Sequence, residues 1–383
     1  MQVYRALRCT TEEVEQFLHE LETLGVVQKL QDEWIRVDSI KSNFCFILKF
    51  QIYNDPNENS RFAVDELKQQ TSNGALMRDT NSPTIAIITC LFVEKQCIDS
   101  IIDNSSTVHR YRSGGDSNVY TLGWIGKHRV VATKLAVIGT HFWFIHSDTR
   151  EATTSAGSIT TRLLGNFQNV EHVFIVGVGG GVAHYTDAAR HIRLGDVVIS
   201  ASTPNAYVFA HSYTLDRKTE NINGFVVRRW NPQDSCIAKI AMEIFNCKFS
   251  IQGGGNVVVI PHPNHERTDS VIHLGSVGAM VSHKKQVSTD ENEDTRDAAS
   301  QIRDRFAAEF GLRAFDAGFD SVIAAVNGSC IDSWTLIRGI ADYQHGQSRA
   351  ARTWQAYAAA RAAALTRSLI LRLPTAQEQH NGH

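Results

Sequence analysis

From residue 84 onward, short apolar runs typical of buried strands alternate with stretches whose apolar residues recur at helical spacing. The predicted strands cover residues 85–91, 130–137, 172–176, 196–200, 256–260 and 335–340. The predicted helices cover residues 158–164, 235–245 and 296–310, and a last helix carries an apolar stripe of Trp354, Ala358, Ala362, Leu365 and Leu369. This alternation predicts a layered α/β domain.

A different pattern begins the chain. Thr10 and Glu13 have the spacing of a capping box, and an apolar stripe of helical period follows until Gly25. Two apolar-rich runs, 26–30 and 34–37, then read as a hairpin. This order of helix and hairpin resembles a winged-helix module. We therefore expect a small α+β module over residues 1–80, a catalytic domain over 81–375 and a polar tail over 376–383, with the linker in the polar stretch 69–83.

The charge of this module argues against nucleic acid. The helix before the hairpin carries five glutamates and no lysine or arginine, so it would repel phosphates. We expect the module to have a regulatory role or to bind a protein partner, and we regard DNA binding as unlikely.

The composition of the whole chain also argues against a nucleic-acid partner. The net charge of -2 over 383 residues gives no general attraction to nucleic acid or to anionic membranes. Seven scattered cysteines without a CxxC pair fit reduced thiols, and no apolar run reaches the length of a membrane span. These features predict a cytoplasmic protein that has a small-molecule partner and makes no membrane contact.

A glycine-rich segment is the first candidate for chemistry. The buried-type strand at 173–176 runs into four glycines within five residues, Gly177 and 179–181, and such a turn would let ligand oxygens approach backbone N–H groups. Val182 occupies the position of the third glycine of a dinucleotide-binding fingerprint, so the segment does not match that fingerprint. A second buried strand follows in the segment RLGDVVIS at 193–200.

Four ordered segments carry a family resemblance. VGVGGG with RLGDVVIS, YTLGWIG at 120–126, IRGIADY at 337–343 and WQAYAAA at 354–360 together resemble the purine nucleoside phosphorylase and nucleosidase superfamily, over residues 84–372. The resemblance is strongest to the nucleosidase branch, in the version found in fungal and animal multidomain proteins and in bacterial defence effectors, some of which act on ATP. It implies a three-layer α/β/α fold and cleavage of a purine N-glycosidic bond without a cofactor or metal.

The resemblance also implies roles for three carboxylates. Asp342 matches the acid that protonates or hydrogen-bonds purine N7, although it could equally cap a helix. Glu94 matches the glutamate that orients and deprotonates water, and its alternative is a surface residue. Asp320 matches the ribose-binding glutamate, with Phe319 packing on the sugar. Asp316 is the alternative if the register slips.

The chain departs from the family at this point, because Asp is one methylene shorter than Glu and Gly318 stands where an acidic residue is common. The resemblance implies further substrate-binding positions, each of which could instead be packing or helix entry, namely Gly177, Val178, Gly179, Gly180, Met280, Val281, Ser155, Ser158, Arg193 and Arg338.

Basic residues would distinguish a nucleotide from a nucleoside substrate. Those in or near the motif loops are Arg110, Arg112, Lys127, His184, Arg190, His191, Arg193, Lys284, Lys285 and Arg352, which are either a phosphate site or scattered surface charge. His262 and His265 lack a second pair of metal ligands, so we expect them to lie in a surface loop.

The sequence therefore predicts a purine nucleoside or nucleotide N-glycosidase, with adenine nucleosides and ATP-type nucleotides among its candidate substrates and with water as the nucleophile. The alternatives are a phosphorylase, with phosphate beside 177–181, and a nucleotide sensor that binds purine without turnover. Members of this superfamily usually assemble as dimers, trimers or hexamers, so we expect a homo-oligomer.

Overall fold

The computed structural model describes residues 19, 27–30, 33–36, 82–109, 118–135, 149–184, 186–187, 190–200, 205–214, 222–246, 270–282, 293–348 and 350–374. The chain divides into two compact units, residues 1–77 and 78–383, and each is described by itself.

In the first unit, strands β1 (Val27–Leu30) and β2 (Glu33–Arg36) form the predicted antiparallel hairpin, in which Val27 pairs with Arg36 and Leu30 with Glu33. His19, within the predicted helix, is helical. The rest of that helix, the linker up to residue 81 and the predicted strand at 256–260 lie outside the described residues.

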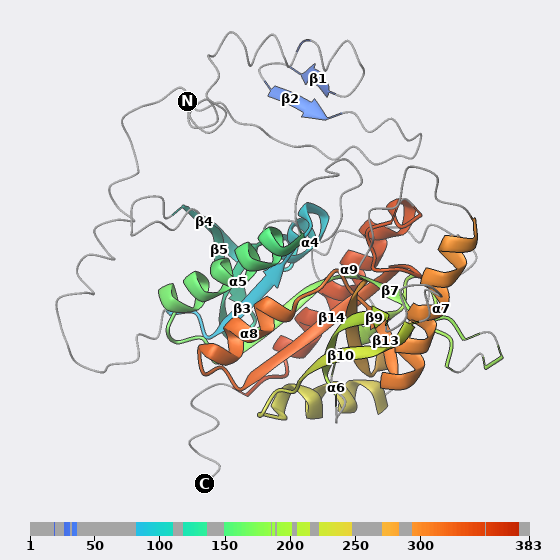
Figure 1. Cartoon of the computed structure of the whole chain (residues 1–383). Coiled ribbons are helices and arrows are strands. Elements are labelled where there is room, and N and C mark those ends of the chain that lie inside the picture. Colours follow the sequence, from blue (N-terminus) through green and yellow to red (C-terminus); the bar gives the residue numbers. More distant parts are fainter. Residues whose placement is uncertain are drawn as a thin grey trace. The chain divides into compact units, whose positions relative to one another are not determined.

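The second unit is built on a 12-stranded mixed sheet, whose main path runs β10-β9-β12-β13-β7-β3-β6-β5-β4, with β14, β8 and β11 branching from β7 (Figure 1). Its strands are β3 (Ile85–Thr89), β4 (Asp103–His109), β5 (Val119–Ile125), β6 (His128–Lys134), β7 (His172–Gly181), β8 (Val197–Ile199), β9 (Tyr207–Thr214), β10 (Ile222–Trp230), β11 (Ile272–Leu274), β12 (Ser276–Ser282), β13 (Leu312–Phe315) and β14 (Ser333–Asp342).

Helices cover both faces of this sheet (Figure 1). The described helices of this unit are α4 (Phe92–Ser100), α5 (Thr149–Asn166), α6 (Cys236–Asn246), α7 (Glu293–Phe310), α8 (Asp320–Gly328) and α9 (Arg352–Ile370). Because side chains alternate across a strand, β3 sends Ala86 and Ile88 into the core under α5 and α8, and Ile85 and Ile87 into the core under α4, α6 and α9. The predicted three-layer α/β/α class is confirmed.

One local prediction was wrong. The four glycines lie inside β7, which remains a strand to Gly181, and not in a turn after it. β14 pairs in parallel with β7 as far as Gly180, while β13 pairs antiparallel with Gly180 and Gly181. Pairing with β14 keeps Gly177, Gly179 and Gly180 extended, and pairing with β13 does the same for Gly180 and Gly181. Their missing side chains let neighbouring groups approach the strand.

Candidate active site

The candidate site lies where the central strands end. β3 and β14 both run parallel to β7, so their carboxyl ends meet at one edge of the sheet. Glu94 follows β3 by a few residues, and Asp342, the last residue of β14, pairs with Gly180. The fold therefore brings both carboxylates to the glycine segment of β7, at the sheet edge where α/β proteins bind ligands.

Glu94 is buried against this segment, although it lies on the first turn of α4. Its Oε2 accepts hydrogen bonds from the backbone N–H groups of Cys90 (2.8 Å) and Leu91 (2.7 Å), and its Oε1 accepts one from Val178 (2.7 Å). Burial raises the pKa of Glu94, while the three N–H donors and the charge of Arg338 act in the opposite direction. A Cβ at residue 177 would lie 2.7 Å from the carboxyl carbon of Glu94, so only glycine leaves it room.

Arg338 lies fully buried beside this carboxylate, on β14. Its Nη2 donates to Asp316 Oδ2 at 3.0 Å, and its guanidinium stacks on the Phe319 ring, 4.3 Å from the centroid. Tyr207 donates its hydroxyl to Asp316 Oδ1 at 2.8 Å and accepts the backbone N–H of Phe319 at 2.7 Å. Arg338 thus supplies a fixed positive charge behind Glu94.

Asp342 organises the loop that follows β14. Its Oδ1 accepts the backbone N–H groups of Gln344 (2.8 Å) and Gly346 (2.7 Å), and its Oδ2 accepts that of Ser348 (3.1 Å). Gly346, at a φ of +83°, packs against the backbone of β7 at Gly179, where a Cβ would lie 2.6 Å from the Gly179 nitrogen. Asp342 therefore orders the loop before α9 and does not cap that helix, whose N-cap is Ala351, and Oδ2 keeps acceptor capacity for a further donor.

His345 belongs to the same loop, and the sequence analysis did not select it. Burial lowers its pKa, and the charges of Asp342, Arg303 and Asp316 act on the ring. Its Nδ1 accepts the backbone N–H of Gln347 at 3.3 Å. A histidine three residues after the candidate acid was the only signal in the sequence.

The two candidate sugar carboxylates differ in availability. Asp316 has a fully buried side chain and both oxygens engaged, since Oδ1 also accepts the N–H of Gly318. Asp320, the first residue of α8, accepts from Trp230 Nε1 (2.8 Å) and Arg228 Nη1 (3.0 Å) of β10, and 14% of its side chain is exposed. Only Asp320 therefore has surface that a ligand could reach, whereas Phe319 beside it is buried.

The other predicted substrate contacts are spread more widely. Met280 packs against the apolar cluster around Phe306, while Val281, the next residue of β12, is 39% exposed. Ser155 and Ser158 are exposed on α5. Arg193 has a half-exposed side chain, and its Nε lies 3.6 Å from Asp196 Oδ2.

Basic groups also lie along the segment that leaves β7. His184 donates its backbone N–H to His191 Nδ1, and His191 Nε2 lies 3.2 Å from the hydroxyl of Tyr343, the residue after Asp342. Arg190 is exposed and lies 3.9 Å from Asp187. Lys127 and Arg352 are also exposed. Arg110, Arg112, Lys284, Lys285, His262 and His265 lie outside the described residues.

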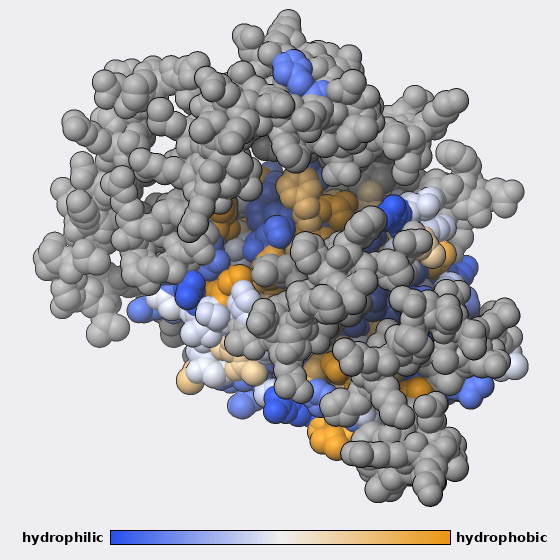
Figure 2. Space-filling view, turned by 45° about the horizontal axis from the view of Figure 1, so that its top comes forward, coloured by the Kyte–Doolittle hydropathy of each residue, from blue (hydrophilic) through white to orange (hydrophobic). Residues whose placement is uncertain are grey.

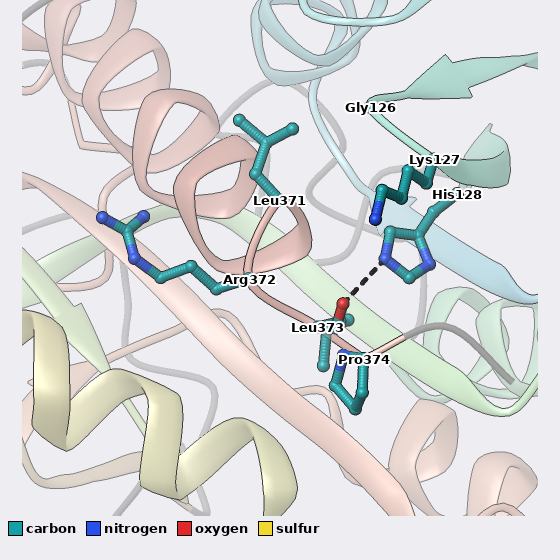
Figure 3. Close-up of a pocket in the computed structure, with 7 residues that line it drawn as sticks. All are labelled: Gly126, Lys127, His128, Leu371, Arg372, Leu373 and Pro374. Atoms are coloured by element: carbon teal, nitrogen blue, oxygen red, sulfur yellow. Dashed lines mark hydrogen bonds between the residues drawn. The ribbon is translucent and has the colours of Figure 1, made fainter. Parts of the chain in front are cut away.

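A pocket of about 470 Å³ lies elsewhere, between the β5–β6 turn and the end of α9 (Figure 3). It is lined by Gly126, Lys127, His128 and residues 371–374, and His128 Nε2 lies 3.0 Å from the carbonyl oxygen of Leu373. Because His128 begins β6, which is parallel to β3, the pocket lies at the amino-terminal edge of these strands, away from Glu94 and Asp342. It contains none of the candidate catalytic residues.

Within the described ranges, no group of three histidine, cysteine or acidic residues could hold a metal ion. No helix among the described residues is long and apolar enough to cross a bilayer. On the face shown in Figure 2, hydrophilic and hydrophobic residues lie next to one another among the described residues.

Comparisons with known proteins bear on each unit separately. Residues 1–38 match the family model described as a winged helix-turn-helix domain, which confirms the winged-helix prediction. No curated protein sequence matches the chain.

Solved structures similar to the chain include nucleosidases of low sequence identity. One is a 5′-methylthioadenosine/S-adenosylhomocysteine nucleosidase from Neisseria meningitidis, with 14% identity, coverage of 76% of this chain and 99% of that chain, and a TM-score of 0.46. Another is an S-adenosylhomocysteine nucleosidase from Streptococcus pyogenes, with 15% identity, coverage of 79% of this chain and 100% of that chain, and a TM-score of 0.47. A third is futalosine hydrolase of Helicobacter pylori, with 15% identity, coverage of 76% of this chain and 97% of that chain, and a TM-score of 0.46. The α/β class rests on the strand order and the two helix layers themselves.

Proposed function

We propose that the chain hydrolyses the N-glycosidic bond of a purine nucleoside or nucleotide. The observation that carries this proposal is the placement of Glu94 and Asp342 on the same glycine segment of β7, at the carboxyl ends of parallel strands. Cleavage of a purine glycoside passes through an oxocarbenium-like transition state, which needs one group to activate water and another to assist the departing base.

Glu94 is the proposed general base. It would take a proton from water as the water oxygen bonds to the anomeric carbon and the bond from that carbon to the purine nitrogen breaks. Burial raises the pKa of Glu94 and makes its ionised form a stronger base, while Arg338 and the three N–H donors keep that form accessible. Asp342, at the other end of the glycine segment, would face the edge of the departing purine.

The same contacts argue against phosphorolysis. In a phosphorylase, the backbone N–H groups of this segment would bind orthophosphate, whereas here Glu94 Oε1 accepts the N–H of Val178 and fills the space above Gly177. A carboxylate at this position would also repel a phosphate anion.

We further propose that the substrate carries a 5′-phosphate group, as in ATP-type nucleotides. In support, His191 contacts Tyr343 next to Asp342, and the exposed side chains of Arg190 and Arg193 belong to the same stretch of chain. Guanidinium groups are the usual partners of phosphate oxygens. A homo-oligomeric state, a cytoplasmic location and a protein partner for the amino-terminal module complete the proposal.

Chromatographic detection of free base tests the reaction. The protein is incubated with adenosine, inosine, methylthioadenosine, AMP and ATP, each with and without phosphate. We expect phosphate-independent base release that falls about 100-fold or more in Asp342→Asn, with AMP or ATP preferred over adenosine. A phosphate requirement would establish the phosphorylase. Purine binding without any release would establish the sensor, whose support is the engagement of both candidate sugar carboxylates by protein groups.

A further inference from the structure

We propose that His345 donates a hydrogen bond from Nε2 to purine N7 while Asp342 accepts one from the 6-amino group, so that the two residues together select a 6-aminopurine. This inference rests on the proposed function and assigns the base-recognition roles at its site.

The tautomer of His345 follows from its backbone contact. Nδ1 lies 3.3 Å from the backbone nitrogen of Gln347, and in the tautomer that accepts this N–H the proton of the neutral ring lies on Nε2. Burial lowers the pKa of the imidazole, which keeps the ring neutral at physiological pH. No partner of Nε2 is found among the described residues, so this N–H is available as a donor.

The position of the ring follows from the loop that carries it. Asp342 accepts the N–H groups of residues 344, 346 and 348, on both sides of His345. Gln355 of α9 donates to the carbonyl of Gly346 at 3.0 Å, and Gly346 packs on Gly179 of β7. The loop is thus fixed on the glycine segment. The charges of Asp342, Arg303 and Asp316 act on the imidazole, and the residue is half-buried.

The chemistry of Asp342 explains why a second group is needed. Every described hydrogen bond of this carboxylate is one that it accepts, and N7 of a neutral purine is also an acceptor. Two acceptors bond only if a proton lies between them. A neutral imidazole N–H on the loop that this carboxylate orders would supply the missing donor.

A donor next to an acceptor matches one class of base. The edge of adenine that carries N7 presents an acceptor at N7 and a donor at the 6-amino group, and proteins read it with such a pair. Guanine and hypoxanthine present two acceptors there, and their O6 would face the carboxylate of Asp342. A site built to bond the 6-amino group should reject them, because its buried polar group would remain unpaired.

Two conservative variants distinguish the role of Nε2 from that of Nδ1 in His345. His345→Asn keeps an acceptor near Nδ1 for the Gln347 N–H and removes the Nε2 donor. His345→Gln can place an amide N–H near the position of Nε2. The probes are the free bases adenine and 7-deazaadenine, which differ at N7 alone and have no glycosidic bond to cleave, and their dissociation constants are measured by calorimetry.

We expect the wild-type protein to bind adenine about tenfold more tightly than 7-deazaadenine. This preference should disappear in His345→Asn and be largely kept in His345→Gln, while hypoxanthine should bind weakly to all three proteins. An unchanged preference in His345→Asn would overturn the His345 assignment, and if base release persists, the proposed function would stand. Failure of the wild-type protein to bind any purine would overturn both.

Discussion

The carboxylate of Glu94 accepts a 2.7 Å hydrogen bond from the backbone N–H of Val178, a residue 84 positions later in the chain. This bond joins the start of α4 to the glycine segment of β7. It is possible because Gly177, immediately before Val178, has no side chain to displace the carboxylate.

Gly177→Ala should therefore damage both folding and activity. Its Cβ would overlap the Glu94 carboxylate, and overpacking of this kind costs about 1–3 kcal/mol. We expect the free energy of unfolding, measured by urea titration, to fall by that amount and base release to fall about 100-fold. Gly165→Ala in α5 is the matched control, since a Cβ there meets nothing within 4 Å and should stabilise the helix by about 0.5–1 kcal/mol. Equal effects of the two variants would contradict this account.

The pH dependence of activity should report the raised pKa of Glu94. Ionised Glu94 is the proposed base, so kcat/KM should rise with pH through a midpoint above the ordinary value of 4.5. Glu94→Gln should abolish this rising limb and lower activity at least 100-fold. A limb centred at or below pH 4.5, or one that survives in the variant, would exclude Glu94 as the base.

The same shift has a consequence for stability. Glu94 binds its proton more tightly in the folded state than in the unfolded chain, so its stabilising contribution is complete below pH 4.5 and is lost as the pH rises through the raised pKa. Relative to Glu94→Gln, the wild-type protein should lose stability across this interval. Denaturant titrations at a series of pH values would measure the free energy of unfolding of both proteins. A wild-type value that rises with pH relative to that of Glu94→Gln would contradict this prediction.

The buried pair of Asp316 and Arg338 should be far more sensitive than the partly exposed pair of Asp320 and Arg228. Removing one partner of a buried pair leaves an uncompensated charge and costs about 3–5 kcal/mol. We expect Asp316→Asn to lose that much stability by urea titration, and the double variant with Arg338→Met to recover part of it. Arg228→Ala, whose side chain is 68% exposed, should cost less than about 1 kcal/mol. Similar losses in both single variants would contradict the assignment.

Asp320 tests the sugar site. If its carboxylate accepts the 2′- and 3′-hydroxyls, Asp320→Asn should raise KM for adenosine about tenfold or more, because hydrogen bonds to charged groups are strong. It should leave KM for 2′,3′-dideoxyadenosine nearly unchanged. A parallel rise for both substrates would indicate that Asp320 serves only its contacts with Trp230 and Arg228.

Several features could be predicted from the sequence because they depend on neighbouring residues. The apolar runs at 85–91 and 335–340 predicted strands that the fold contains, and the two runs after residue 25 predicted the hairpin of β1 and β2. The family resemblance assigned Glu94 and Asp342 to the site, and both residues lie at the carboxyl ends of buried strands, at the sheet edge. Alternating patterns along the chain were sufficient to predict these strands and the hairpin.

Tertiary structure decided the rest. Only the pairing of β7 with β14 and β13 shows that the glycines stay extended, and only long-range packing brings Arg338 onto Asp316 or turns Asp320 toward β10. His345 gave no periodic signal, because its surroundings are set by where Asp342 and β7 hold its loop. Local sequence determines which residues form strands and helices, whereas the partner of a buried charge depends on residues far apart in the chain, which meet only in the folded protein.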